Sequence, residues 1–278
     1  MAPPFKARCS VSLKIATWNI NSVRLRMPIV LRYLKAHGPD ILCLQETKCR
    51  DSEFPSSDLR AAGYEHLAIN GQKGYHGVAI ASRLPIKKIE KREFCKMGDA
   101  RHISATFSYG ESDITVHNFY VPAGGDIPDR ELNSKFGHKL DFLVEMADWI
   151  AKEKLAGSPS VLMGDLNIAP LEHDVWSHKA LLKVVSHTPI EIEHLQNVFT
   201  SGPWVDALRT KIPADQKLYT WWSYRSPNWE TANKGRRLDH VWISADLEHA
   251  LQDLEILKEA RGWERPSDHV PVMISLKL

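Results

Sequence analysis

The sequence predicts an α/β (α+β) fold in which two packed, mostly antiparallel β-sheets are flanked by helices, in four layers: helix, sheet, sheet, helix. Segments with the apolar pattern of strands outnumber those with the pattern of helices. About five such strands follow one another between residues 64 and 121 without a helix, which argues against a doubly wound parallel sheet, the main alternative. Polar residues also recur at predicted strand ends in both halves of the chain, as expected if the loops at one edge share a cleft.

Short apolar runs separated by Gly, Pro or charged residues dominate the first half of the chain. The predicted strands there cover residues 14–20, 40–44, 64–70, 77–82, 86–91, 102–108 and 114–121. One helix interrupts them, because Pro28 is typical of an early helical position and an amphipathic run continues to His37 and Gly38. A loop rich in Gly, Pro and Asp is expected at residues 123–130.

The second half mixes helices and strands. Apolar residues at helical spacing, including Leu140, Val144 and Ile150, predict a helix over residues 130–154 that is closed by Gly157. A second helix is expected at residues 189–199, and a polar loop at 225–236. The predicted strands cover residues 159–163, 218–222, 237–244 and 268–276.

Length and composition indicate a single domain over residues 13–278 after a loose tail at residues 1–12. Lys and Arg number 36 against 34 Asp and Glu, so the net charge is +2 and any nucleic-acid-binding face must be local. No segment approaches the roughly 18 apolar residues that span a membrane, and the tail lacks the apolar core of a signal peptide. Four cysteines without metal-ligand spacing favour a reducing, cytoplasmic compartment. With no heptads or exposed apolar helix, the expected state is a monomer.

The stretch from Val161 to Pro170 carries the clearest functional pattern. Its apolar run stops at Gly164, which indicates a buried strand whose end opens into a loop. Alternation along an extended chain places Asp165 and Asn167 on the same side, about 7 Å apart. Taken alone, this pattern also fits a simple Asx-type turn.

Eight polar residues lie at predicted strand ends, and together they favour a functional site. Several carboxylates at one sheet edge would repel one another unless a cation neutralises them. Their oxygens suit Mg²⁺ or Mn²⁺ better than zinc, whereas a histidine is a poor Mg²⁺ ligand and is free for proton or phosphate contacts. This predicts a metal-assisted phosphoester site; N-caps, turns and solvated carboxylates are the alternatives. The eight are Asn19, Glu46, Tyr120, Asp165, Asn167, Asp239, Asp268 and His269.

Seven blocks of the sequence resemble the exonuclease III branch of the endonuclease/exonuclease/phosphatase superfamily, the bacterial apurinic/apyrimidinic (AP) endonucleases. They are TWNINSVRLR (17–26), LQETK (44–48), HNFYVPAGG (117–125), GDLNIAP (164–170), YTWWSYRS (219–226), RRLDHVWIS (236–244) and SDHVPV (267–272). GDLN and SDH are shared with pancreatic deoxyribonuclease, inositol polyphosphate phosphatases and sphingomyelinases, whereas HNFYVPAGG and the tryptophan-rich block favour the DNA-repair branch. The resemblance implies a four-layer αββα sandwich and a Mg²⁺-dependent nuclease. Such an enzyme would act on double-stranded DNA at abasic sites, 3′ ends and nicks, leaving 3′-hydroxyls.

The resemblance also implies residue roles. Asp165 would orient or deprotonate the attacking water, and Asn167 would hold Asp165 and stabilise charge on the phosphoryl oxygens. His269, positioned by Asp239, would bind a phosphoryl oxygen or transfer a proton, and Tyr120 would contact the phosphate or assist the leaving group. The ligands expected for one or two ions are Glu46 as the principal one, Asn19 and Asp268, and then Asp165, Asn167 and His269.

Contacts with DNA need cations for phosphates and flat side chains for stacking. Trp221 and Trp222 are candidates for the wall of a pocket that takes a sugar lacking its base. Because strand alternation sends neighbours to opposite faces, at least one of them is expected in the core. The candidate phosphate contacts are Arg24, Lys48, Arg101 and Arg236, although scattered Lys and Arg are often simply solvated.

Arg236 departs from the family pattern, in which the residue before Arg-Leu-Asp is commonly apolar or aromatic and helps to line the abasic pocket. A charged side chain there could narrow the pocket or grip a flanking phosphate. One alternative function is therefore a 3′-exonuclease/3′-phosphatase with little AP endonuclease activity. A small-molecule phosphodiesterase or phosphatase is a second, against which the tryptophan pair counts. A non-catalytic DNA-binding module is a third, against which the complete acid–base set counts.

Overall fold

The computed structural model describes residues 12–109, 112–153, 155 and 158–278. One group of strands comprises β1 (Ser12–Asn19), β2 (Ile41–Gln45), β3 (His66–Asn70), β4 (Val78–Ser82), β13 (Leu251–Ile256) and β14 (Val272–Lys277). A second comprises β5 (Ile86–Lys91), β6 (His102–Tyr109), β7 (Ser112–Tyr120), β8 (Ser160–Asp165), β9 (Trp204–Asp206) and β12 (Asp239–Ser244). A short ribbon is formed by β10 (Trp221–Trp222) and β11 (Gly235–Arg236). The helices are α1 (Val23–His37), α2 (Ser56–Ala61), α3 (Ser134–Glu153), α4 (His178–Leu181), α5 (Pro189–Thr200), α6 (Ala207–Lys211) and α7 (Trp229–Ala232).

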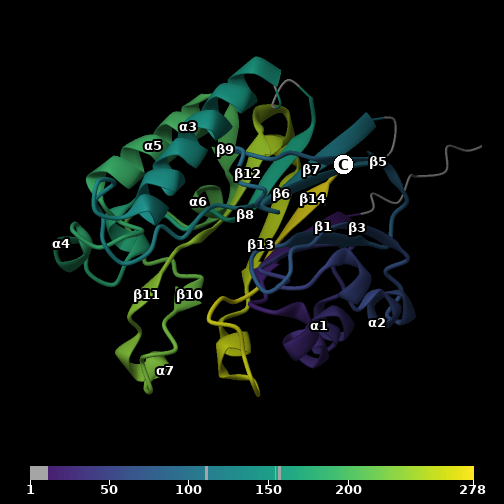
Figure 1. Ribbon diagram of the computed structural model, residues 1–278. Coiled ribbons are helices and arrows are strands. Elements are labelled where there is room, and N and C mark those ends of the chain that lie inside the picture. The colour runs from purple at the N-terminus through teal and green to yellow at the C-terminus, as the bar shows by residue number, and fades with distance from the viewer. Residues whose placement is uncertain (1–11, 110–111, 154, 156–157) are drawn as a thin grey trace, which may run out of the picture.

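The two groups of strands form two six-stranded sheets packed against each other, with helices on the outer faces (Figure 1). One sheet has the order β13-β14-β1-β2-β4-β3 and the other β5-β6-β7-β8-β12-β9. The pairs β1–β2 and β7–β8 are parallel, and the other pairs described within these sheets are antiparallel. The predicted four-layer sandwich is confirmed.

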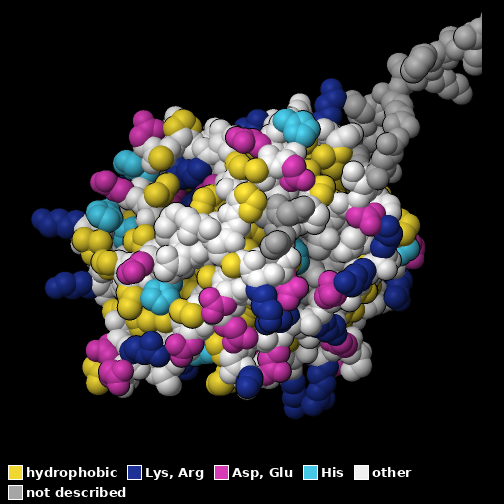
Figure 2. All heavy atoms as spheres, turned by 90° about the horizontal axis from the view of Figure 1, so that it is seen from above, with side chains coloured by type: hydrophobic (Ala, Val, Ile, Leu, Met, Phe, Trp, Pro, Cys, Tyr) yellow, Lys and Arg dark blue, Asp and Glu magenta, His cyan; other side chains and the backbone are white. Residues whose placement is uncertain are grey.

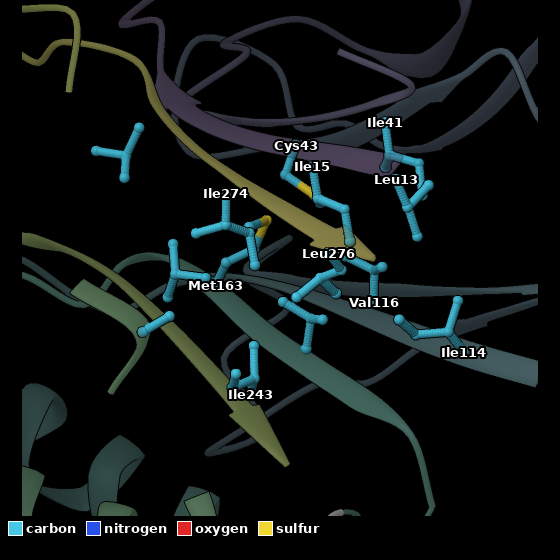
Figure 3. Packing of buried hydrophobic residues seen from close by; sticks show 14 of the residues in the cluster. Leu13, Ile15, Ile41, Cys43, Ile114, Val116, Met163, Ile243, Ile274 and Leu276 are labelled. Atoms are coloured by element: carbon cyan, nitrogen blue, oxygen red, sulfur yellow. The ribbon is translucent and has the colours of Figure 1, made fainter. Parts of the chain in front are cut away.

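Alternation along β1 divides its side chains between two cores. Leu13 and Ile15 pack between the sheets against residues of the second sheet (Figure 3). Ala16 and Trp18 point the other way, into the cluster that holds the buried face of α1. A third cluster joins α3 and α5 to the outer face of the second sheet. The central strands β2, β4, β8 and β12 are therefore buried on two faces, which is why they read as nearly continuous apolar runs.

Several predicted boundaries and contacts were wrong. Helix α1 begins at Val23, so Pro28 lies inside the helix rather than at its start. Val144 is 49% exposed and belongs to the solvent face of α3. The predicted polar loop at 225–236 contains α7 and β11. The strand predicted over 268–276 begins at Val272, because Asp268 and His269 lie in the preceding loop.

Besides α7 and β11, the elements α2, α4, α6, β9 and β13 were not predicted. Each is short or carries a weak apolar pattern; β13 has one buried residue among six, because it lies at a sheet edge. The predicted helix end at Gly157 and the tail at residues 1–11 lie outside the described residues, whereas Ser12 already belongs to β1.

The surface agrees with the small net charge. Basic and acidic side chains are interspersed over the face seen in Figure 2. Among the described residues, no helix is both long enough and apolar enough to cross a membrane.

Candidate active site

The polar residues predicted at strand ends meet at one edge of the two sheets. Because β1–β2 and β7–β8 are parallel, the chain leaves each pair on the same side. Their ends are in register: Asn19 is opposite Gln45, which precedes Glu46, and Tyr120 is opposite Asp165. Asp239, the first residue of the antiparallel strand β12, is also opposite Asp165. The topology thus places polar ends from both sheets side by side.

Hydrogen bonds join these ends across the gap between the sheets. The Asn19 amide Nδ2 donates to Glu46 Oε1 at 2.9 Å and to Asp165 Oδ2 at 2.8 Å. Asn19 is fully buried, so its amide links a residue after β2 to a residue of β8 in a fixed arrangement.

The GDLN turn has the backbone geometry that its sequence requires. At Gly164 a Cβ atom would lie 2.0 Å from the Phe119 carbonyl oxygen, so no other residue fits. Asn167 has φ +56°, and its backbone N–H donates to Asp165 Oδ1 at 2.9 Å. This hydrogen bond forms the Asx-type turn that the sequence pattern of Asp165 and Asn167 also fitted. The other Asp165 oxygen, Oδ2, also accepts from Asn167 Nδ2 at 3.1 Å, so the turn presents an acid and an amide together.

His269 connects two carboxylates. Its Nδ1 donates to Asp239 Oδ2 at 2.8 Å, and its Nε2 lies 3.6 Å from Asp165 Oδ2. Burial opposes the imidazolium charge, but Asp239 and Asp165 together outweigh burial and raise the pKa of His269 to about 10. Burial raises the pKa of Asp165 to about 7, although His269 opposes the rise. Asp165 therefore has a pKa close to neutral pH, which suits a general base.

Glu46 and Asp268 form the second acidic part of the site. Burial opposes ionisation of Glu46, but the charge of Lys48 and the Asn19 hydrogen bond lower its pKa below the ordinary value. Asp268 is similar: burial opposes ionisation, whereas His269 and the Trp221 hydrogen bond lower its pKa. Both side chains are therefore ionised at neutral pH.

The donor set fits a hard cation. Ligand atoms of Asp165, Asp239 and His269 lie within 4.8 Å of one another, and the buried Asp239 Oδ1 has no hydrogen-bond partner among the described residues. The Asn19 amide nitrogen joins the Glu46 carboxylate to this group, and the Asn19 oxygen Oδ1 accepts from the Asn21 backbone N–H at 3.0 Å. Oxygen-rich sites of this kind suit Mg²⁺ or Mn²⁺.

The site opens into a cleft of about 800 Å³. Five of the eight predicted residues line it, namely Glu46, Asp165, Asn167, Asp268 and His269. Asn19, Asp239 and Tyr120 are buried and support these from behind. Burial raises the pKa of the Tyr120 hydroxyl well above its ordinary value, so this group stays protonated.

Only some of the residues predicted to contact DNA line the cleft. Trp221 and Arg236 line it, and Arg24 is exposed. Trp222 is 2% exposed and packs against Tyr219 and Trp229, so it was wrongly included among the candidate DNA contacts. The expectation that at least one member of the pair lies in the core is confirmed.

Two of the predicted phosphate contacts are held by protein groups instead. Arg101 is buried; its Nε donates to Asp99 at 2.9 Å and its Nη1 to the Tyr120 carbonyl at 3.2 Å, which contradicts a direct phosphate contact. Lys48 pairs with Glu46.

Arg236 spans the cleft wall. Its Nη1 donates to the Val185 carbonyl at 2.9 Å and to Ser186 Oγ at 2.7 Å, and its guanidinium lies 5.4 Å from the Trp221 ring centroid. Ser186 and Trp176, which also line the cleft, were missed. Both lie in a stretch where no motif marks a site, so only the fold brings them here.

Comparison with known proteins agrees with this geometry. The model of the endonuclease/exonuclease/phosphatase family matches residues 16–269. The chain therefore belongs to the endonuclease/exonuclease/phosphatase family.

Individual relatives narrow the resemblance. The chain is 31% identical over 95% of its length to Exodeoxyribonuclease III of Haemophilus influenzae, of which it covers 100%. It is 32% identical over 96% of its length to the DNA repair nuclease APEX1 of Danio rerio, covering 83% of it. Among solved structures, the 3′ phosphatase NExo from Neisseria, bound to a product DNA hairpin, has a TM-score of 0.87 at 32% identity, covering 96% of this chain and 100% of that one. An AP endonuclease from Archaeoglobus fulgidus has a TM-score of 0.87 at 33% identity, with the same coverage. The predicted resemblance to the exonuclease III branch, and with it the class of nuclease hydrolases, is confirmed.

Proposed function

We propose that this protein is a Mg²⁺-dependent DNA repair nuclease that hydrolyses phosphodiesters of double-stranded DNA and leaves 3′-hydroxyl ends. The observation that carries the proposal is the Asp239–His269–Asp165 series, joined through Asn19 to Glu46 at the base of an open cleft. The relatives named as DNA repair enzymes support the choice of DNA over a small-molecule phosphoester.

Each side chain has a chemical task in this proposal. Asp165 accepts the proton of the attacking water, which its pKa of about 7 permits. The Asn167 amide orients Asp165; its second N–H donates to the Val121 carbonyl at 2.9 Å and would have to leave that acceptor to donate to the phosphoryl oxygens, where negative charge develops. Asp239 keeps His269 protonated and aimed, so that His269 binds a non-bridging oxygen. Mg²⁺, or Mn²⁺ in its place, would be held by Glu46, Asp268 and Asn19 and would act as a Lewis acid on the phosphodiester.

We further propose that 3′-end processing outweighs cleavage at internal abasic sites. Arg236 links β11 to the Val185–Ser186 loop, so its side chain occupies the wall where a base-free sugar would insert. Opening that wall would break two hydrogen bonds from a charged donor, which makes insertion costly.

The direct test is an end-labelled duplex with one internal abasic analogue, incubated with Mg²⁺ and separately with EDTA. We expect Mg²⁺-dependent shortening from the 3′ end, with weak incision on the 5′ side of the analogue. A dominant single cut at the analogue would refute the proposed balance. No cleavage of DNA at all would favour the small-molecule phosphatase alternative.

The role of Arg236 is tested by Arg236→Trp, with Arg225→Trp as the matched control. Arg225 lines the same cleft, but its side chain is exposed and makes no contact with the Val185–Ser186 loop among the described residues. Arg236→Trp should raise abasic incision relative to exonuclease activity, because the wall loses its charged link. If both variants change the ratio equally, loss of charge alone explains the result and the proposed link is refuted.

A further inference from the structure

We propose that Thr220 is a positioning residue for the Asp239–His269 pair, and that its hydroxyl sets where Asp239 lies relative to the imidazole. The inference rests on the proposed function, because it concerns the rate of the same reaction. Its basis is one side-chain oxygen, Thr220 Oγ1, that accepts two consecutive backbone N–H groups, those of Leu238 and Asp239, each at 3.1 Å. Thr220 is fully buried, so it reaches the reaction through these contacts and not by touching the substrate.

The backbone around Thr220 holds the other member of the pair. The Val270 N–H donates to the Thr220 carbonyl at 2.9 Å, and the neighbouring Trp221 lies opposite His269 in an antiparallel bridge. Thr220 thus binds Asp239 through its side chain and the residue after His269 through its main chain. One buried residue joins the two segments whose side chains form the 2.8 Å hydrogen bond from His269 Nδ1 to Asp239 Oδ2.

The hydroxyl acts where β12 begins. Strand β12 pairs with β8 from Asp239 onward, whereas its pairing with β9 covers Trp242–Ser244, at the other end of the strand. The carboxylate of Asp239 is held through Oδ2, since its Oδ1 has no hydrogen-bond partner among the described residues. The position of this carboxylate therefore depends on the backbone that the Thr220 hydroxyl holds.

Loss of the hydroxyl would leave two buried N–H groups without their acceptor. Buried donors without a partner are costly, so the backbone at Leu238 and Asp239 would shift to find another one. A displacement of about 1 Å at a catalytic group can lower the rate by about 100-fold. The hydrogen bond between Asp239 and His269 would lengthen or turn in the same movement.

The test compares Thr220→Val, which nearly keeps the shape of the side chain but removes its oxygen, with Thr220→Ser, which keeps the oxygen. Turnover is measured on the end-labelled duplex with Mg²⁺. Thr220→Val should lower kcat by about 10- to 100-fold with KM nearly unchanged, because the displaced groups act on the reacting phosphodiester and not on DNA binding as a whole. Thr220→Ser should retain a kcat close to that of the wild type. Near-wild-type kcat in Thr220→Val, or an equal loss in both variants, would overturn the inference.

The matched control is Ser244→Ala. Ser244 is also fully buried, and its Oγ accepts from the Ser160 backbone N–H at 3.0 Å, but it lies at the end of β12 opposite to Asp239. This variant should lose stability, measured by thermal unfolding, and keep its kcat. If Ser244→Ala loses as much kcat as Thr220→Val, destabilisation alone explains the result and the positioning role is refuted.

Proton NMR in water gives a readout that needs no turnover. The signal of the His269 Nδ1 proton, identified by its absence in His269→Gln, should move in Thr220→Val and stay in place in Thr220→Ser. If Thr220→Val does not fold, Thr220→Ala removes the same oxygen and takes its place. An unmoved signal would overturn the inference even where the wild type cleaves DNA. A wild type that cleaves no DNA would refute the proposed function, and the NMR comparison would then decide the positioning by itself.

Discussion

The buried pair of Lys139 and Glu191 gives a demanding test of how the cleft is held. Neither side chain is exposed, and Lys139 Nζ lies 2.5 Å from Glu191 Oε1. Lys139 Nζ also donates to the Asn167 carbonyl at 2.8 Å. Glu191 accepts from the backbone N–H groups of Ser186 and Thr188. One ion pair therefore joins the catalytic loop to the loop that holds Arg236.

The perturbation is Lys139→Met, which keeps the apolar stem and removes the charge. Glu191 would then be a buried carboxylate without its cation, which costs about 3–5 kcal/mol. At roughly 2–4 °C per kcal/mol for a chain of this size, the midpoint of thermal unfolding should fall by roughly 10 °C. Because the Asn167 carbonyl also loses its donor, kcat should fall more than KM rises.

Denaturant unfolding at pH 7 in EDTA measures the loss directly. The double variant Lys139→Met/Glu191→Gln is the control, because it removes both charges. It should be more stable than Lys139→Met alone by about 1–3 kcal/mol, because it no longer buries an unpaired charge. If Lys139→Met stays within about 1 kcal/mol of wild type, or if the double variant is no better than the single one, the reasoning fails.

Two further predictions concern the base and the pH range. Asp165→Asn should lower kcat by roughly 100- to 10,000-fold while DNA affinity persists, because the general base is lost. Single-turnover kinetics would measure the rate, and fluorescence anisotropy would measure DNA binding. Near-normal turnover would exclude the assigned role. Burial lowers the pKa of His117 from 6.5 to about 4, so between these values the unfolded state binds the extra proton and stability falls as pH falls. From pH 7 to 5 this group should remove about 2 kcal/mol of unfolding free energy. His117→Gln should flatten that dependence, whereas a change at the exposed His249 should not; identical pH profiles for all three proteins would contradict it.

Local patterns account for the part of the site that sequence predicted well. The GDLN turn depends on a glycine that alone tolerates the Phe119 carbonyl and on an Asx turn between near neighbours. The carboxyl ends of β2 and β8 lie within two residues of the predicted ends, because the apolar runs stop where the chain leaves a buried sheet. The division of Trp221 and Trp222 between cleft and core also follows from strand alternation.

Contacts between distant segments could not be predicted. Lys139 lies in a helix whose apolar spacing was recognised, yet nothing in that spacing marks a lysine as buried, since its partner Glu191 is 52 residues away. Likewise, Arg236 was recognised as unusual, but its acceptors at Val185 and Ser186 depend on how β11 meets a distant loop. Local spacing defines the elements, whereas the pairing of charges depends on the finished packing.

Two cations near the active site, Lys48 and Arg236, are already paired with protein acceptors. Lys48 neutralises Glu46, and Arg236 binds the Val185 carbonyl. With a net charge of +2 and mixed charges on the surface, long-range attraction of DNA is weak, so affinity has to come from the cleft itself. A ligand gains these cations only by replacing their present partners. Discrimination between DNA ligands then depends on whether a phosphate or a 3′ end binds these cations better than their present protein partners do.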